Sequence, residues 1–161
     1  MTRKEYNNAV DLFADNLFRF ALKHLKNEML ANDVVQDTFT KVWIKHEEIN
    51  NEKIKSYLFT TAYHAIVDCA KKENRSKDIV KSKEPSRHYE AEFNLQDVLN
   101  EALDILPEIQ KTVVLLRDYE GYNYSEIAEI TDLNESQVKV YIFRARKSLQ
   151  QYLGSVEKVL G

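Results

Sequence analysis

The chain has 161 residues, of which 43% are hydrophobic, and its 23 Lys and Arg against 26 Asp and Glu give a formal net charge of −3. The single cysteine excludes an internal disulfide, and no apolar run approaches the roughly 20 residues that a membrane-spanning helix needs. The N-terminus lacks a signal-peptide pattern. We therefore expect a protein of the reducing cytoplasm, without membrane insertion.

The N-terminal part predicts a bundle of amphipathic helices. Apolar residues recur at helical spacing over residues 5–26, 30–47 and 54–72, with the polar break HEEINNEK before the last of these. The side chains expected to point inward include Phe39 and Trp43 in the second helix and Leu58, Ala62, Ala65, Ile66 and Cys69 in the third. We expect these helices to form one compact domain over residues 1–75.

A linker and a second helical domain follow. Residues 76–93, SKDIVKSKEPSRHYEAEF, carry charge, serine and proline but few apolar anchors, so we expect a flexible linker. Helical spacing resumes at Leu95, Pro107 suits the first turn of a further helix, and Gly121 ends that helix. With only 3 Gly and 2 Pro in the chain, the sequence predicts an all-α protein, its second small domain spanning residues 94–161.

The second domain contains a helix-turn-helix pattern over residues 124–149, YSEIAEITDLNESQVKVYIFRARKSL. Ser125 is the expected N-cap of its first helix, and Asn134 with Gln137 makes a capping box for the second. Asp132 stands in the turn, where such units usually have glycine. Aspartate tolerates the left-handed conformation that this position requires.

The second helix of this pattern carries cations on one side. Its inward stripe is expected to run through Val138, Ile142, Ala145, Leu149 and Leu153. The side chains expected to contact DNA are Ser136, Gln137, Lys139, Val140, Phe143, Arg144, Arg146 and Lys147. The cations suit phosphates or guanine edges, whereas the exposed apolar pair suits thymine methyls, a neighbouring helix or an inhibitor. A plain amphipathic surface helix with solvated cations is the alternative.

The net charge limits how such a helix can act. Phosphate neutralisation supplies most non-specific DNA affinity, and a chain of charge −3 is poorly suited to it. Acidic residues from Asp97 to Glu129 precede the basic helix, so this region has opposite electrostatic ends. We expect the chain alone to bind DNA weakly and to need a partner that supplies most of the affinity.

Three blocks, ANDVVQDTFTKVW, IKSYLFTTAYHAIVDCAKK and LPEIQKTVVLLRDYEGYNYSEIAEITDLNESQVKVYIFRARKSL, together resemble the sigma-70 family of bacterial transcription initiation factors. The resemblance is to the extracytoplasmic-function (ECF) type, which keeps only the second and fourth conserved regions. It implies a factor without cofactors that binds RNA polymerase core. The first domain would recognise and melt the minus 10 element, and the second would read the minus 35 element. An anti-sigma factor is a further implied partner.

The resemblance also assigns roles to residues of the first domain. It places docking on the clamp helices of the largest polymerase subunit at Asn32, Asp33, Gln36 and Asp37. It places contacts to minus 10 DNA at the aromatic residues Tyr57, Phe59, Tyr63 and His64 and at the cations Lys71, Lys72 and Arg75. A place in the bundle core is the alternative for Tyr57 and Phe59. Thr60, His64 and Tyr141 depart from the residues that are frequent in the family.

Other functions find less support in the residues. His64, Asp68 and Cys69 lie near one another, but a chance cluster explains them better than a metal site. The chain shows no catalytic constellation, so we expect no enzyme. The alternatives are an autonomous helix-turn-helix repressor or activator with a helical dimerisation domain, and a helical adaptor that binds protein.

Overall fold

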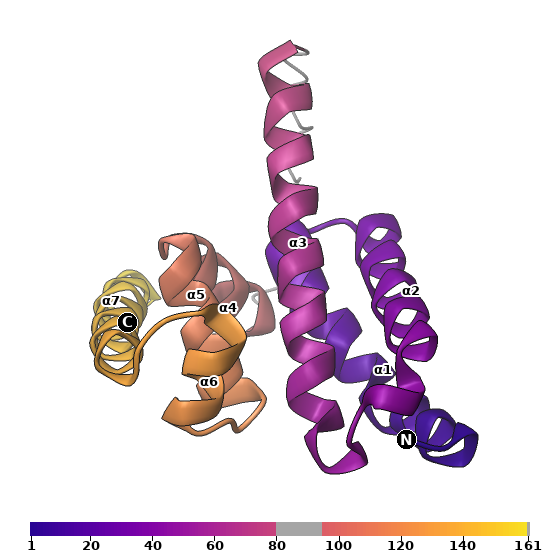
Figure 1. Ribbon diagram of the computed structural model, residues 1–161. Helices are drawn as coiled ribbons and strands as arrows, with labels where there is room; N and C mark the ends of the chain where they lie inside the picture. Colours follow the sequence, from indigo (N-terminus) through magenta and orange to yellow (C-terminus); the bar gives the residue numbers. More distant parts are fainter. Residues whose placement is uncertain (80–94, 161) are drawn as a thin grey trace. The chain divides into compact units, whose positions relative to one another are not determined.

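The computed structural model describes residues 1–79 and 95–160, and these residues form helices without any strand. The all-α expectation is therefore confirmed, and the chain divides into two compact units. The helices of the first unit are α1 (Arg3–Leu25), α2 (Glu28–Ile44) and α3 (Ile54–Ile79), with the short 3-10 helices η1 (His46–Glu48) and η2 (Asn51–Lys53) before α3. The helices that follow along the chain are α4 (Leu95–Asp104), α5 (Glu108–Val114), the π-helix η3 (Leu115–Tyr119), α6 (Tyr124–Thr131) and α7 (Glu135–Leu160) (Figure 1).

Polar caps set where the first two helices begin. Thr2 and Glu5 form a capping box at the start of α1, with the Glu5 amide 3.1 Å from Thr2 Oγ1 and the Thr2 amide 2.8 Å from Glu5 Oε1. This hydrogen bond from the Thr2 backbone lowers the pKa of the Glu5 carboxyl. α1 ends at Leu25, and its C-cap residue Lys26 adopts a φ of 54°. Asn27 follows directly as the N-cap of α2, and its side chain accepts from the Leu30 amide.

The core of the first unit lies where α1, α2 and α3 pack against one another (Figure 1). The rings of Phe20 on α1 and Phe59 on α3 meet edge to face at 5.5 Å between centroids. Leu17, Leu58 and Ala62 are fully buried around them. The three-helix bundle that the apolar spacing predicted is confirmed.

The C-terminal end of α2 is held by aromatic contacts with α1. The Tyr6 hydroxyl donates to the Phe39 carbonyl oxygen at 2.9 Å, and the Tyr6 ring lies 4.9 Å from the Trp43 ring. Trp43 also stacks on His46, with centroids 4.1 Å apart and planes within 4°. Trp43 is nevertheless 40% exposed, so its expected place in the core is wrong. It lies one residue from the end of α2, where His46 and Tyr6 cover part of the ring and the rest remains open to water.

Helix α3 is longer than the sequence predicted. It continues to Ile79, so the backbone of residues 76–79 is helical although we expected it in the linker. The reason is that extending an existing helix costs much less than nucleating a new one, so α3 can continue through residues of modest helix propensity. Residues 80–94, the remainder of the expected linker, lie outside the described part of the chain.

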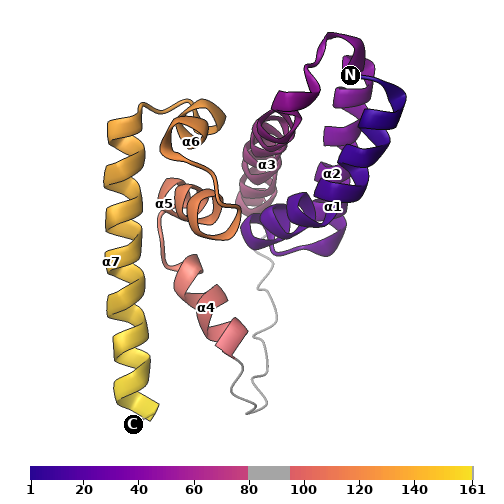
Figure 2. The ribbon, with the colours of Figure 1, turned by 90° about the horizontal axis from the view of Figure 1, so that it is seen from below.

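In the second unit, α7 packs along α5 and α4 (Figure 2). Val113 and Val114 of α5 and Val138 and Ile142 of α7 are all at most 2% exposed. Pro107 is the N-cap of α5, one position before the first-turn place that we expected. Gly121 adopts a φ of 76° after η3, as its expected role in ending this helical segment requires.

A buried lysine joins α4 to α5. Lys111 is only 2% exposed, and its ammonium lies 3.1 Å from a carboxylate oxygen of Asp104, whose side chain is 33% exposed. A buried charge is tolerated when a partner of opposite charge remains beside it. The two side chains therefore differ in their exposure to solvent, because water still reaches the carboxylate but hardly reaches the ammonium.

This difference in exposure predicts different losses of stability when either charged side chain is replaced. Asp104→Ala leaves a buried ammonium unpaired and should lower the free energy of unfolding of the second unit by about 1–3 kcal/mol. Lys111→Met leaves a carboxylate that water can solvate and should cost less. Urea unfolding followed by far-UV circular dichroism measures both losses. Trp43 lies in the first unit, so its fluorescence transition is the internal control and should not move; an equal loss in both variants would contradict the argument.

Candidate nucleic-acid interface

A capping box on each helix positions the helix-turn-helix. Asn123 caps α6: its amide donates to Glu126 Oε1 at 3.1 Å, and its Oδ1 accepts from the Glu126 amide at 2.8 Å. Ser125, which we expected as the cap, already lies inside α6, so that prediction is wrong. The reason is that the side chains of Asn123 and Glu126 each accept a hydrogen bond from the backbone amide of the other residue. A cap at Ser125 would start the helix two residues later and would leave this pair unused.

The turn and the start of α7 agree with the sequence. Asp132 adopts a φ of 58°, the left-handed conformation that the turn was expected to require. The Asn134 and Gln137 capping box is confirmed, with bonds of 3.0 and 2.8 Å. Because Gln137 Oε1 accepts from the Asn134 amide, this oxygen serves the helix start, and the side-chain NH₂ is the group that it can offer to a base.

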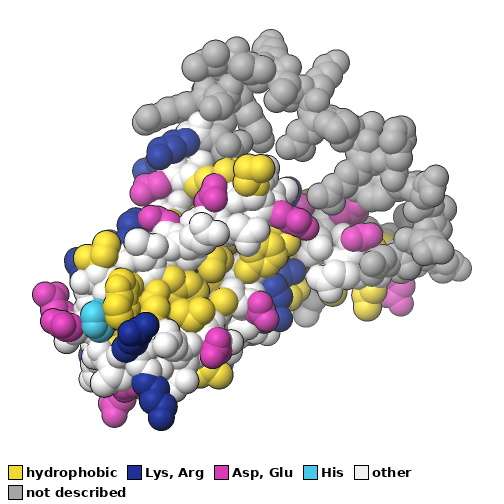
Figure 3. Space-filling model, turned by 90° about the vertical axis from the view of Figure 1, so that its right-hand side faces the viewer, with side chains coloured by type: hydrophobic (Ala, Val, Ile, Leu, Met, Phe, Trp, Pro, Cys, Tyr) yellow, Lys and Arg dark blue, Asp and Glu magenta, His cyan; other side chains and the backbone are white. Residues whose placement is uncertain are grey.

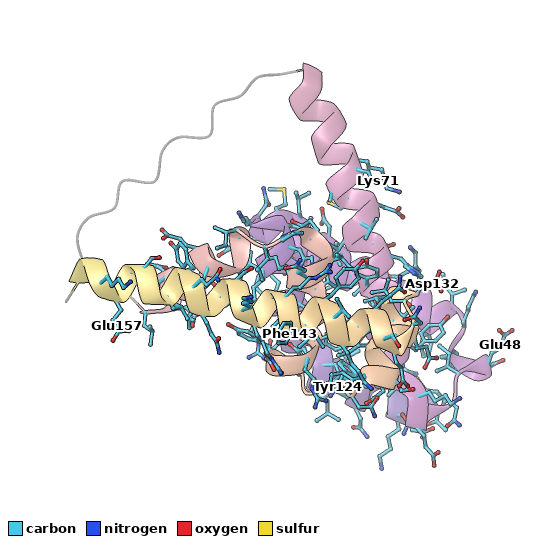
Figure 4. All side chains as sticks on the ribbon, turned by 90° about the vertical axis from the view of Figure 1, so that its left-hand side faces the viewer. Glu48, Lys71, Tyr124, Asp132, Phe143 and Glu157 are labelled. Atoms are coloured by element: carbon cyan, nitrogen blue, oxygen red, sulfur yellow. The ribbon has the colours of Figure 1, made fainter. Side chains whose placement is uncertain are left out.

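The outward face of α7 carries the predicted DNA-contacting side chains. Phe143 is 69% exposed and Val140 44% exposed, while Val138, Ile142 and Ala145 on the opposite side are buried. Figure 4 looks onto α7, with Phe143 partway along the helix and Asp132 near its N-terminal end. The remaining predicted contact residues of this face are also exposed; they are Ser136, Gln137, Lys139, Arg144, Arg146 and Lys147.

Arg146 is held by a carboxylate of the same unit. Its Nη2 donates to Asp118 Oδ1 at 2.6 Å, and its Nε donates to Asp118 Oδ2 at 3.2 Å, so the contact is bidentate. These hydrogen bonds raise the pKa of the Arg146 guanidinium. This carboxylate pair distinguishes Arg146 from the other cations that were predicted to contact DNA, although its side chain remains exposed.

Tyr124 lies beside two further cations. The Arg117 guanidinium carbon is 4.6 Å from the centre of the Tyr124 ring, and the Lys139 ammonium is 5.6 Å from it. Both distances allow cation–π attraction. Arg117 also donates to the Tyr122 carbonyl oxygen at 2.9 Å, which fixes the guanidinium next to the turn after η3. Figure 4 labels Tyr124 beside α7.

In the first unit, the predicted docking residues of α2 share one exposed face. Asn32, Asp33, Gln36 and Asp37 are all exposed, whereas Val34 on the other side is buried. The Asp37 carboxylate lies 3.0 Å from the Lys41 ammonium, one helical turn away. Figure 3 shows hydrophobic side chains gathered on one face of the molecule, with charged side chains around them.

Helix α3 separates its predicted DNA contacts into two groups. His64, Lys71 and Lys72 are exposed, and Tyr57 and Tyr63 are partly buried. Phe59 is 0% exposed and contacts Phe20, so the structure places it in the bundle core, the alternative that we gave for it, and not among the exposed DNA contacts. Helical periodicity explains this, because Phe59 lies two residues from Tyr57 and therefore on the opposite side of the helix. The Arg75 side chain lies outside the described part of the structure, although its backbone belongs to α3.

Sequence reasoning missed several residues of the second unit. Asn123 had a visible signal, because Asn123 and Glu126 have the same spacing as Asn134 and Gln137. No sequence signal pointed to Asp118, because it is 28 residues from Arg146 and only the fold brings the two together. The same holds for the approach of Arg117 to Tyr124.

Within residues 1–79 and 95–160, no group of three or more His, Cys, Asp and Glu side chains is arranged to hold a metal ion. None of the helices in that part of the chain combines the length and the apolar character needed to cross a membrane.

Comparison with known proteins identifies both units. The family model for Sigma-70 region 2 matches residues 9–76, and that for Sigma-70 region 4 matches residues 96–149. The RNA polymerase sigma factor SigV of Bacillus subtilis is 32% identical over 142 residues, which cover 84% of this chain and 82% of SigV. The ECF RNA polymerase sigma factor SigM of the same organism is 27% identical over 149 residues, or 86% of this chain and 89% of SigM.

Solved structures show the same fold. The sigma factor RpoE of Bartonella quintana, solved in complex with the anti-sigma factor NepR, is 25% identical with a TM-score of 0.79 and covers 94% of this chain and 98% of its own. CnrH, solved in complex with the cytosolic domain of CnrY, is 20% identical with a TM-score of 0.71 and covers 96% and 90%. The chain thus belongs to the sigma-70 family of RNA polymerase sigma factors, and within it to the extracytoplasmic-function type.

Proposed function

We propose that this sigma factor binds RNA polymerase core and directs it to promoters through separate faces of its two units. The observation that best supports this proposal is the exposed face of α7. Its apolar stripe is buried, so cations and Phe143 are exposed on one side of a helix-turn-helix in which both helices are capped. The exposed acidic face of α2 supports the second part of the proposal, since an autonomous repressor has no need of it. Residues 1–79 would thus act near the minus 10 element and residues 95–160 at the minus 35 element.

For core binding, we assign the face that contains Asn32, Asp33, Gln36 and Asp37 to the clamp helices of the largest polymerase subunit. The face is exposed, and its two carboxylates lie one helical turn apart. Core polymerase would supply the affinity for DNA that a chain of net charge −3 lacks. Core also performs the chemistry of RNA synthesis, so we assign no catalytic role to this chain, and we place it in the cytoplasm, where bacterial transcription occurs.

For the minus 10 element, we retain the surface residues of α3 and omit Phe59. Tyr57, Tyr63 and His64 offer ring faces for unpaired bases, and the exposed Lys71 and Lys72 offer charge to the backbone. The Tyr63 and His64 rings lie 6.1 Å apart, so the two can act at neighbouring bases. Arg75 remains part of the proposal from its position on α3.

For the minus 35 element, the proposed contacts are on α7. Lys139, Arg144 and Lys147 would contact phosphates or guanine edges, and Ser136 with the Gln137 NH₂ group would approach bases near the helix start. Val140 and Phe143 present exposed apolar surface that suits thymine methyl groups. Arg146 is treated separately because Asp118 already holds it.

We further propose an anti-sigma factor as a regulatory partner. RpoE was solved with the anti-sigma factor NepR and CnrH with the cytosolic domain of CnrY, and both share the fold of this chain. The exposed Phe143 and Trp43 provide apolar surface that a partner protein can cover while core and DNA are absent. To test this, proteins that co-purify with the chain would be identified. An anti-sigma factor should be among them and should release the chain when core is added.

Run-off transcription tests the proposal as a whole. Purified core with this chain should give discrete products from a subset of genomic DNA fragments, and core alone should give none, because core has no promoter selectivity of its own. Binding to a palindromic DNA site with no effect on core would support the repressor instead. Omitting the chain and replacing it with an unrelated sigma factor are the two controls.

Charge reversal on α2 tests core docking. Asp37→Arg should weaken binding to core at least tenfold, because it places a cation where the proposal puts a carboxylate contact. Fluorescence anisotropy of the labelled chain titrated with core measures the effect. Lys41→Ala breaks the same ion pair but keeps Asp37, and Asp15→Arg reverses an exposed charge on α1; both should bind like the wild type. Wild-type affinity in Asp37→Arg would remove this face from the proposal.

Removal of one cation tests the minus 35 contact. Lys139→Ala should reduce open-complex yield and lower the slope of log affinity against log salt by about one, because one phosphate contact is lost. Lys158→Ala is the matched control, since Lys158 is an exposed lysine of the same helix about 28 Å farther along its axis. An unchanged yield at every salt concentration would exclude Lys139 from the interface.

A further inference from the structure

We infer that Arg146 is a positioning residue rather than a DNA contact, and that Asp118 and Arg146 together form a brace that sets how α7 is presented to the minus 35 element. This inference rests on the proposed function and adds a specificity-determining pair to it. Neither Asp118 nor the bond between the two residues follows from the sequence spacing of the helix-turn-helix.

The pair forms a bidentate salt bridge of defined geometry. Nη2 and Nε of Arg146 bind the two carboxylate oxygens of Asp118 at 2.6 and 3.2 Å. A bidentate contact fixes the direction of both side chains, which a single hydrogen bond does not do. The joined segments are η3 and α7, which are 28 residues apart in sequence. The brace therefore acts between the support of the recognition helix and the helix itself.

A second contact holds the same side of α7. Arg117, the residue before Asp118, lies over the Tyr124 ring, and Lys139 of α7 lies near that ring as well. Lys139 and Arg146 are seven residues apart, or about two helical turns, so both are on one flank of α7. Adjacent residues of η3 thus reach this flank at two levels, one directly and one through Tyr124.

The charge balance argues against a phosphate contact by Arg146. In the braced state the guanidinium and the carboxylate compensate each other at the edge of the face. If Arg146 turned to a phosphate, Asp118 would remain without this partner and close to the DNA backbone, where its charge is repelled. Holding the pair together avoids both costs.

The test compares variants in the complete holoenzyme. Core with the wild-type chain first selects promoters from DNA fragments whose upstream element is randomised, which yields a preferred and a rejected sequence. Affinity for both is then measured over a series of salt concentrations with Asp118→Ala, Arg146→Ala, Arg146→Lys and the double variant D118A/R146A. Lys147→Gln serves as the reference for loss of a phosphate contact, and far-UV circular dichroism confirms that each variant is folded at the assay temperature.

A brace predicts one pattern. Asp118→Ala, Arg146→Ala and the double variant should each reduce the preference for the selected sequence by roughly two- to fivefold, with no further loss in the double variant. The salt slope should stay at the wild-type value, whereas Lys147→Gln lowers it by about one. Arg146→Lys should not restore the preference, because lysine keeps the charge but lacks the bidentate fork.

Other results overturn the inference. A salt slope lowered by about one in Arg146→Ala, together with wild-type preference in Asp118→Ala and in Arg146→Lys, would make Arg146 a phosphate contact. Equal losses on the preferred and rejected sequences would reduce the pair to a role in folding stability. Failure of the proposed function is distinguishable from both, because the wild-type holoenzyme would then select no sequence at all.

Discussion

The function of the second unit depends on burial of the apolar stripe of α7 against α5. Val138, Ile142 and Ala145 are at most 2% exposed, and only with this side fixed can the opposite side face a ligand in a defined orientation. Apolar burial decides which side of the helix faces inward, but it is not directional, so it sets the exact rotation and the axial position only loosely. The directional bonds, namely the caps at Asn123 and Asn134 and the Asp118 pair, supply what burial lacks.

The first unit solves the same problem with different side chains. Buried Val34, Phe39 and Val42 hold α2 against its neighbours, and Asp33 and Asp37 remain exposed on the other side. The Tyr6 hydroxyl gives the directional bond here by binding the Phe39 carbonyl oxygen. Each unit therefore presents one exposed helical face whose placement is set by apolar contacts and refined by a few polar ones.

Helical periodicity predicted much of this arrangement because it is a local property of the chain. It placed Val138 and Ile142 inward and Phe143 outward, and the spacing of Asn134 and Gln137 located the start of α7. The errors have particular causes. Phe59 was grouped with nearby aromatic residues by composition rather than by helix side, and Trp43 lies where a helix ends and periodicity no longer decides exposure. The partner of Arg146 was beyond reach, because no local pattern records a contact between residues 28 positions apart.

The π-helical segment η3 has a consequence for the phase of the chain. A π-turn holds about one residue more than an α-turn, so residues on its two sides differ by about 100° from the angular relation of a continuous α-helix. Val113 and Val114 before it are buried, and Arg117 and Asp118 within it reach Tyr124 and Arg146. This one short segment of irregular winding serves both the core, through the buried Leu115 and Leu116, and the flank of the recognition helix, through Arg117 and Asp118.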